Sequence, residues 1–520
     1  MSSANSNSAK LSLDVVSTAY EATLAFLSLA HDQIMGAGLE AIIDIFSVVA
    51  SPFAPILQDL VKREVEHSYA DIARLQNATK RTEEIFTSSS IPKTVDHLSL
   101  ICANIFPLVK GSLTRFEVLN CGCRAAATIA NIDSQIGDHI NELSIAISTL
   151  SVSMANDVNR AADNFDEQDV EGALELLKMA GLFMNNLQSF GVFAQERLRS
   201  LLAGLDASII LEREGAPDSL SAGEVGVLIA RKVFREDSEV HSADLTGICN
   251  VSPNEFHEKK IPISYQAGQK LASACRMFVF DLCYAVPRKW LTSMSALSEW
   301  IEEDDGNIDI MSSYSILPQS YITHVGEHIL ALVQALEPFA SNASALTLSK
   351  GAMKNMNSVA IEPWREMASS IGCASGEDDG LIDSLMEGKS LPDFVIISEF
   401  EEDEEEVDES HRFCNEWLGV ISAAVTGRIL ERMLKIQTLS SKGRDHLVTD
   451  INYIENVFSA LGVSGHPHPL LTHFSTILAL NEDDLKEMLS QRKDSGYGRK
   501  IDRVLISAET RIAQMRNVAL

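Results

Sequence analysis

Large apolar residues recur at intervals of three and four along most of this chain, a spacing that places them on one face of an α-helix. The pattern is clearest over 411–463, whose second half contains Leu447, Ile451, Ile454, Phe458 and Leu461. The first half repeats the pattern around Trp417, Ile421 and Val425. Ser440 and Ser441 lie between the halves, where a serine can cap the start of a helix. We therefore predict a helical hairpin here.

The same spacing predicts helices on both sides of the hairpin. Upstream of it we expect helices at 13–34, 39–49, 56–87, 92–110, 112–132, 133–158, 168–187, 190–211, 264–300, 320–337, 362–370 and 381–386. Downstream of it we expect helices at 470–480, from 482 after an Asn481 cap, and at 499–516. Pro338 is expected just after the end of its helix, because proline interrupts helical hydrogen bonding. Short turns between neighbours favour antiparallel packing.

These elements predict an all-α protein with antiparallel neighbours, organised either as three or four domains or as one long helical stack. With aromatic residues at only 6% of the chain, a β-sandwich or barrel is disfavoured. We predict six segments: a disordered tail at 1–10, N-terminal helical bundles at 11–211, a polar connecting region at 212–263, a middle helical bundle at 264–390, an acidic loop at 391–410 and a C-terminal helical bundle at 411–520.

The strongly negative net charge of the chain disfavours some classes of binding partner. The formal net charge is −31, which repels nucleic-acid phosphates and anionic lipids, so we expect neither as a direct ligand. This charge either keeps the chain soluble or attracts basic partner surfaces. The stretch 399–409 holds nine acidic residues in eleven. Such a run is typical of a solvated loop, with metal binding or docking of a basic partner as alternatives.

Cysteine usage and hydropathy indicate a cytosolic protein. The eight cysteines are scattered and show no paired framework, which favours a reducing compartment. The start of the chain lacks the basic and apolar regions of a secretory signal. The most apolar stretch, 39–57, is interrupted by Glu40, Asp44, Pro52 and Pro55, which a membrane-spanning helix tolerates poorly. Any membrane association is therefore expected to be peripheral.

Catalytic motifs are missing from the sequence. It has no phosphate-binding glycine loop, no nucleophile elbow and no zinc-protease motif, so we expect a scaffold rather than an enzyme. Three weak metal candidates are interpreted as structural: the Cys121 and Cys123 pair as buried thiols, the His324 and His328 pair as part of a helix, and the cluster of His466, His468 and His473 as a proline-rich turn whose histidines face water.

Four blocks in the C-terminal half carry a resemblance to a known family, and their specificity lies in order and spacing. The blocks are Leu317-Pro318-Gln319-Ser320-Tyr321-Ile322 with Gly326-Glu327-His328-Ile329 and Leu336-Glu337-Pro338-Phe339; Asn415-Glu416-Trp417-Leu418-Gly419; Asp450-Ile451-Asn452-Tyr453 with Asn456-Val457 and Ala460-Leu461-Gly462; and Thr510-Arg511-Ile512-Ala513 with Met515-Arg516-Asn517-Val518. They resemble the subunit-seven family of the conserved oligomeric Golgi complex, a vesicle tether. The resemblance is strong over 264–520 and weak but collinear over 1–263.

The resemblance implies an all-α fold of consecutive antiparallel helical bundles stacked into an elongated rod. It also implies a non-catalytic subunit without a cofactor. Its expected work is retrograde vesicle traffic within the Golgi and, indirectly, the maintenance of Golgi glycosylation. It implies subunits five, six and eight of the same complex as partners, SNAREs or Rab proteins reached through the complex, and a peripheral place on the cytosolic face of Golgi membranes. Family members are usually longer and begin with a coiled-coil-like segment, so binding to subunit five through that segment is not expected of this sequence. The alternative hypothesis is a helical interaction scaffold of another tether or adaptor pathway.

Within the motif blocks, some residues have a predicted structural role. Trp417, Tyr453 and Leu461 are predicted to have structural roles, and Trp417 is predicted to lie in a core. For Tyr321 and Asp450, a buried hydrogen bond and a contact with a partner are both open. The remaining motif residues proposed as structural are Pro318, Gly326, Pro338, Leu418, Gly419 and Gly462.

Overall fold

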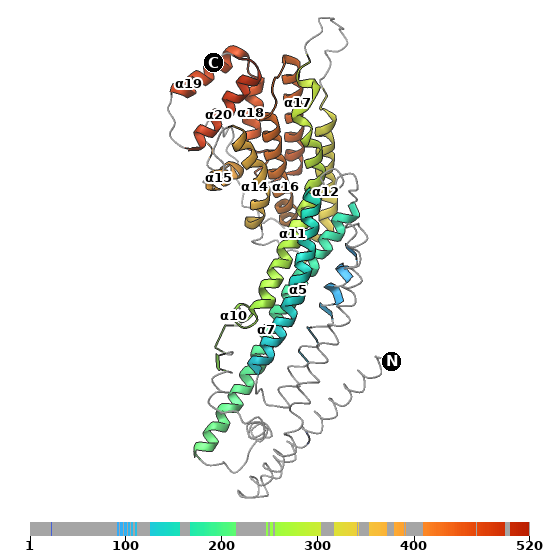
Figure 1. Cartoon of the computed structure of the whole chain (residues 1–520), viewed down its shortest axis with the longest axis vertical. Helices are drawn as coiled ribbons and strands as arrows, with labels where there is room; N and C mark the ends of the chain where they lie inside the picture. Colours follow the sequence, from blue (N-terminus) through green and yellow to red (C-terminus); the bar gives the residue numbers. More distant parts are fainter. Residues whose placement is uncertain are drawn as a thin grey trace. The chain divides into compact units, whose positions relative to one another are not determined.

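The structure is a computed structural model of the 520-residue chain (Figure 1). It describes residues 22, 91–92, 94–96, 98–100, 102–103, 106–107, 110–111, 125–156, 167–214, 246–247, 250–252, 255–302, 317–340, 342, 353–371, 379–388, 391, 409–463, 465–494 and 500–518. Outside these residues lie the predicted tail at 1–10, almost all of the three helices predicted before residue 88, the Cys121 and Cys123 pair, and nearly all of the acidic run.

Every regular element in the described part of the chain is a helix, which confirms the all-α prediction. The α-helices are α5 (Ala125–Asn156), α7 (Glu167–Glu214), α10 (Phe256–Lys260), α11 (Pro262–Thr292), α12 (Ser320–Ala340), α14 (Met353–Ser370), α15 (Asp379–Glu387), α16 (Glu409–Leu434), α17 (Ser441–Leu461), α18 (Pro469–Ala479), α19 (Glu482–Asp494) and α20 (Lys500–Met515). Two 3₁₀ helices, η2 (Met294–Ala296) and η3 (Ser298–Trp300), follow α11. None of these helices combines the length and apolar character that crossing a bilayer requires.

Contacts divide the chain into two compact units: 1–146 with 179–273, and 147–178 with 274–520. In the first unit, a buried carboxylate holds the start of α11. Asp133, on α5, accepts hydrogen bonds from the backbone amides of Ser264 at 2.7 Å and Ile263 at 3.1 Å. The Ser264 hydroxyl donates in return to the Asp133 carbonyl oxygen at 2.8 Å. These amides have no partner within their own helix, so α5 supplies one from another part of the chain.

Two predicted helix breaks in this region are wrong. The sequence predicts a boundary at 132/133, but α5 runs through it, because Asp133 caps α11 instead of starting a helix of its own. It also predicts separate helices at 168–187 and 190–211, but α7 is one helix of 48 residues. Gly191 does not mark a turn. A Cβ at this position would lie 3.1 Å from the Phe256 ring, so the glycine lets α10 approach the helix closely.

The second unit is organised around α16, which packs against α12, α14 and α20. Of residues 420–431, all but Ala423 are buried. A helix buried on nearly all sides belongs to the interior of a larger assembly of helices. The helices predicted to form a middle bundle (α12 and α14) and those predicted to form a C-terminal bundle (α16 to α20) therefore share one core. Figure 1 shows α12, α16 and α17 side by side in this unit.

Several boundaries in this unit match the sequence, and three do not. The helix predicted at 264–300 ends at Thr292, and two 3₁₀ helices follow it. Ser440 caps α17 by accepting the Gly443 amide, and Asn481 caps α19 by accepting the Asp484 amide, as predicted. Pro338 lies inside α12 instead of after it, two residues before the helix ends at Ala340. The helix predicted at 362–370 is longer and begins at Met353, with Pro363 inside it.

Candidate functional site

The two longest motif blocks of the sequence meet where α12 begins against α17. Asp450, on α17, is 1% exposed. One of its carboxylate oxygens accepts the backbone amide of Gln319 at 2.7 Å, and the other accepts the Tyr321 hydroxyl at 2.9 Å. Of the two possibilities left open by the sequence, the structure shows the buried hydrogen bond. Asp450 thus caps α12 from another helix and fixes where that helix starts.

Burial sets the protonation of this contact. Removal from water raises the pKa of Asp450 to about 6, and the hydrogen bonds from Gln319 and Tyr321 oppose that rise. Burial and the Asp450 charge raise the pKa of Tyr321 well above its usual value, so its hydroxyl stays a donor. No ion pair compensates the carboxylate among the residues that the structure describes. We call Gln319, Tyr321, Asp450, Gly326 and Tyr453 the α12–α17 joint.

Gly326 and Tyr453 complete this joint. A Cβ at Gly326 would lie 2.7 Å from the Cε1 and hydroxyl oxygen of Tyr453, nearer than real Cβ atoms come. The half-buried Tyr453 ring therefore lies across the bare backbone of α12. Glycine in one motif and tyrosine in the other therefore form the two sides of one contact, although they are more than a hundred residues apart in the sequence.

The other motif residues occupy ordinary structural positions. Trp417 and Leu418 are buried in α16, and Leu461 is half-buried. Gly462 ends α17 in the left-handed region at φ 60°, which glycine adopts without strain. Pro318 is half-buried before α12, Pro338 is exposed near its end, and Gly419 has Val463 as its neighbour at 3.9 Å from a built Cβ.

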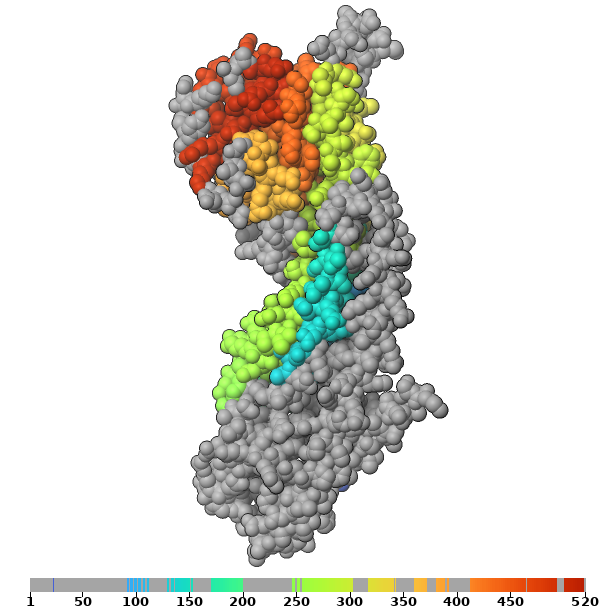
Figure 2. Space-filling view, in the orientation of Figure 1, coloured from blue at the N-terminus to red at the C-terminus, as the bar shows by residue number. Residues whose placement is uncertain are grey.

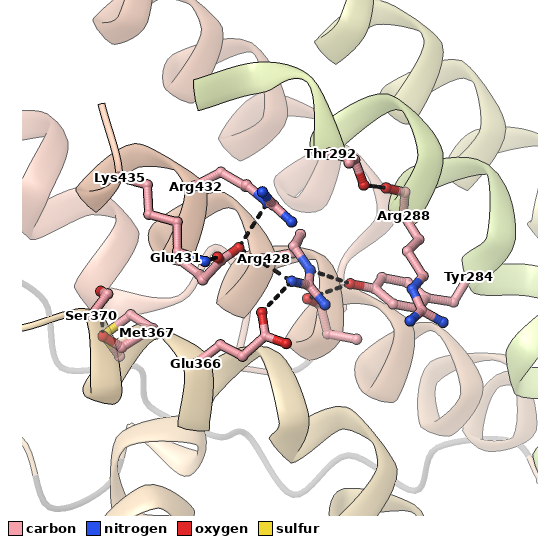
Figure 3. A network of polar contacts seen from close by, with 11 residues as sticks. Tyr284, Arg288, Thr292, Glu366, Met367, Ser370, Arg428, Glu431, Arg432 and Lys435 are labelled. Carbon is pink, nitrogen blue, oxygen red and sulfur yellow. Dashed lines mark hydrogen bonds and ion pairs between the residues drawn. The ribbon is translucent and has the colours of Figure 1, made fainter. Parts of the chain in front are cut away.

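A buried polar network crosses α11, α14 and α16, and sequence reasoning missed it (Figure 3). Arg428 lies 2.6 Å from the Glu366 carboxylate and 3.2 Å from Glu431, and its Nε lies 3.4 Å from the Tyr284 hydroxyl. Glu431 is fully buried and also pairs with Arg432 at 3.0 Å and with Lys435. The neighbouring carboxylates and Tyr284 outweigh burial and raise the pKa of Arg428. The available signal was an arginine and a glutamate three residues apart within the mostly apolar stretch 417–434.

The histidine cluster differs from its prediction, because His468 and His473 are buried and His466 is half-buried. His468 is 2% exposed and caps α18: its Nδ1 accepts the Leu470 amide at 3.2 Å, and its Nε2 donates to the Met386 carbonyl at 3.2 Å. Both nitrogens are occupied in this way only when the ring is neutral. Burial lowers the pKa of His468 to about 4 and that of His466 to about 3. We call His468, Leu470 and Met386 the α15–α18 joint.

The third histidine of the cluster belongs to a different buried pair. His473 Nε2 lies 2.9 Å from the carboxylate of Glu509, which is fully buried, and Arg492 lies 3.6 Å from its other oxygen. This contact joins α18, α19 and α20. The three histidines therefore do not converge on one point, and no group of three or more His, Cys, Asp or Glu side chains in the described part of the chain could hold a metal ion.

The last motif block ties the end of the chain to two other helices. Arg511 donates to the carbonyl oxygens of Leu434 at 3.0 Å and Ile436 at 2.9 Å, just where α16 ends. Arg516 donates to the Leu480 carbonyl at 2.8 Å, at the end of α18. Carbonyls at a helix C-terminus lack partners within the helix, and arginine satisfies them with favourable charge.

His324 and His328, the remaining metal candidates, have separate roles. His328 is buried, and its Nε2 lies 2.8 Å from the Cys283 carbonyl oxygen. His324 is exposed and its ring stacks on Trp290 at 4.1 Å between centroids. The two side chains therefore point to different neighbours, although they are four residues apart on one helix.

Comparison with known proteins decides the family. The family model described as Golgi complex component 7 (COG7) matches residues 8–365 and 395–517, which cover most of both units. The chain belongs to the COG7 family. The motif blocks at 317–339, 415–419 and 450–462 fall within the matched parts, and the last block does so except for Val518, so the α12–α17 joint lies within the match.

Curated relatives of this COG7-family chain carry the same subunit name at low identity. The Arabidopsis thaliana protein named conserved oligomeric Golgi complex subunit 7 is 22% identical over 488 residues, which is 87% of this chain and 51% of the relative. The human protein of that name is 25% identical over 251 residues, 48% of this chain and 26% of the relative. The Bos taurus protein is 19% identical over 510 residues, 95% of this chain and 57% of the relative. The chain spans about half the length of the Arabidopsis and Bos taurus relatives. No solved structure matches it significantly.

Proposed function

We propose that this chain is a non-catalytic subunit of the conserved oligomeric Golgi tethering complex. It acts in intra-Golgi retrograde vesicle transport and so in the maintenance of Golgi glycosylation. The observation that carries the proposal is the COG7 family match, which runs collinearly from residue 8 to 517 with one gap. Relatives from plants and mammals that bear the same subunit name support it.

The buried polar groups of the second unit support a structural rather than a catalytic role. Asp450, Arg428 and Glu509 each bind groups on other helices, and each is enclosed by packing. A catalytic group must reach a substrate, whereas these side chains form hydrogen bonds and ion pairs that hold helices together. Such a framework suits a protein whose task is to present surfaces to partners.

The proposed partners are subunits five, six and eight of the same complex, with SNAREs or Rab proteins engaged through the complex. The proposed location is the cytosolic face of Golgi membranes, with peripheral attachment. A formal net charge of −31 supports attachment through proteins rather than through anionic lipid.

Affinity purification of the endogenously tagged chain, followed by mass spectrometry, tests this proposal. The same tag is imaged against a Golgi marker. We expect several subunits of the Golgi complex in the eluate and a Golgi pattern in the cell. An eluate without any of these subunits, from cells that express them, would overturn the proposal and leave a helical scaffold of another tether or adaptor pathway.

A further inference from the structure

Positive charge gathers where α16 ends, although the formal net charge of the chain is −31. Cationic side chains from α16, from the residue after it and from α20 lie there: Arg428, Arg432, Lys435 and Arg511. In the described part of the chain, the carboxylates that pair with these cations are Glu366 and Glu431. Cations therefore outnumber carboxylates at this place. Figure 2 shows the orange and red C-terminal helices, which carry these cations, at the surface of the second unit.

Two of the cations share a carboxylate that a third already holds. Glu431 is fully buried, and Arg428 lies 3.2 Å from it and 2.6 Å from Glu366. Arg432 Nε lies 3.0 Å from the same Glu431 carboxylate, and Lys435 also pairs with it. Figure 3 shows Arg432 and Lys435 above Glu431, on the side away from Glu366. Among the described residues no other carboxylate pairs with Arg432 or Lys435, so their charges are only partly compensated.

These partly compensated cations reach solvent, and their donors are already held in place. The side chains of Arg432 and Lys435 are 21% and 43% exposed, whereas that of Arg428 is 5% exposed. Arg432 meets Glu431 through Nε, which leaves the planar pair of terminal nitrogens for a carboxylate from outside. Arg511 is fixed by two backbone carbonyls, at 3.0 and 2.9 Å, through Nε and Nη2. Donors that are fixed in advance lose little conformational freedom when a ligand binds.

The negative charge of the rest of the chain does not cancel this local surplus. At physiological ionic strength, exposed charges more than about 8 Å apart are largely screened from each other. A short acidic segment of a protein meets only the local cations, and its carboxylates can bind an arginine through two parallel hydrogen bonds. An anionic membrane is a wide surface that also faces the acidic remainder of the chain, so it is repelled.

We propose that Arg432, Lys435 and Arg511 form a docking site for an acidic segment of a partner protein, which we call the cationic site. An Asp or Glu side chain of the partner binds the terminal nitrogens of Arg432 and the ammonium group of Lys435. Arg428 continues to neutralise Glu431 from the interior. The inference rests on the proposed function, because a tether subunit works by binding other proteins.

The test titrates the purified full chain into a fluorescein-labelled peptide of alternating Asp and Glu residues and measures anisotropy. The variant Arg432→Gln with Lys435→Gln removes two cations of the site. Its matched control, Lys486→Gln with Arg503→Gln, removes a lysine and an arginine from exposed positions of α19 and α20. We expect the first variant to bind about tenfold more weakly than the wild type, and the control to bind as the wild type does. Added salt should weaken binding by the wild type.

Three further measurements complete the design. A peptide of alternating Asn and Gln residues should not bind. Vesicles that contain phosphatidylserine should not bind either, because the expected ligand is a protein segment. Lys435→Gln alone changes a side chain that is 43% exposed, so it keeps the test decisive if the double variant does not fold in circular dichroism. We expect it to weaken peptide binding about threefold.

Several results would overturn the proposal. One is equal binding of the acidic and the uncharged peptide by the wild type. Another is equal peptide binding by the two double variants or, where the first does not fold, by Lys435→Gln and the wild type. Binding of vesicles without binding of the acidic peptide would assign the site to a membrane instead. None of these results depends on co-purification with Golgi complex subunits, so failure here is distinguishable from failure of the proposed function.

Discussion

The α12–α17 joint and the α15–α18 joint both use a buried titratable side chain to hold a helix, but they respond to protons in opposite ways. Asp450 receives two donors, and burial raises its pKa to about 6. His468 accepts one hydrogen bond from a backbone amide and donates one to a backbone carbonyl, and burial lowers its pKa to about 4. Burial favours the neutral form in each case. Protonation removes the buried charge of Asp450 and so stabilises the first joint, whereas it places a buried charge on His468 and so breaks the second.

Truncation of Trp417 should destabilise both joints together. Trp417 is 1% exposed in α16, the helix that packs against α12 and α14. We expect Trp417→Ala to lower the free energy of unfolding by about 3–5 kcal/mol through the cavity it leaves. Chemical denaturation measures this loss, and Trp417→Phe is the control. Because the indole nitrogen has no hydrogen-bond partner among the residues that the structure describes, we expect the phenylalanine variant to lose far less. An unchanged denaturation midpoint for Trp417→Ala would contradict its place in the core.

Removal of the Asp450 side chain should break the first joint alone. Asp450→Ala leaves the Gln319 amide and the Tyr321 hydroxyl buried without an acceptor, so we expect a loss of about 3 kcal/mol in unfolding free energy. Asp450→Asn keeps one acceptor oxygen for Gln319, and its loss should be about 1 kcal/mol. Urea denaturation at neutral pH compares the two variants. Equal losses of unfolding free energy in the two variants would show that the hydrogen bonds accepted by Asp450 do not hold this joint.

Removal of the His468 side chain should lower the free energy of unfolding by less than removal of the Asp450 side chain does, because α15 is a shorter helix than α12. His468→Ala removes the cap of α18 and the bond to the Met386 carbonyl, and we expect a loss of about 2 kcal/mol. Limited proteolysis of the folded variant should show faster cleavage near residues 379–391 than in the wild type. Protection equal to that of the wild type would mean that His468 does not hold α15.

The contact of Gly326 with Tyr453 should give the smallest effect. Gly326→Ala places a methyl group against the tyrosine ring, and we expect a loss of about 1–2 kcal/mol. In the background of Tyr453→Ala the same substitution meets open space and should be nearly neutral. A double-mutant cycle measured by denaturation tests this coupling. Additive losses would show that the two motif residues do not act on each other.

Local sequence patterns predicted most of the helices, but they could not predict contacts between residues that are far apart in the sequence. The Ser440 cap and the apolar stripe of α20 follow from neighbours in sequence, and both are present. The pairing of Tyr321 with Asp450 joins residues 129 positions apart, so a single sequence carries no signal for it. The same limit hid the partners of Arg428. The histidines of the 465–469 turn were predicted to face water because a polar turn is usually exposed, yet packing by α15 and α16 encloses them.

The pH dependence of two neutral replacements tests the opposition of the two joints most directly. The folded chain binds a proton at Asp450 near pH 6, above the value of 3.8 for the free side chain, so this group stabilises the fold as the pH falls through 6. The folded chain resists protonation of His468 until about pH 4, whereas the unfolded chain takes up the proton near 6.5, so this group destabilises the fold as the pH falls through 6.5. Over pH 7.5 to 5.5, each effect amounts to about 1 kcal/mol.

The measurement is the free energy of unfolding of the wild type, Asp450→Asn and His468→Gln across this pH range. Differences from the wild type at each pH cancel the contributions of the other titrating groups. We predict that on acidification Asp450→Asn loses stability relative to the wild type, while His468→Gln gains it. Differences that move in the same direction, or that do not change with pH, would contradict the account of the two joints.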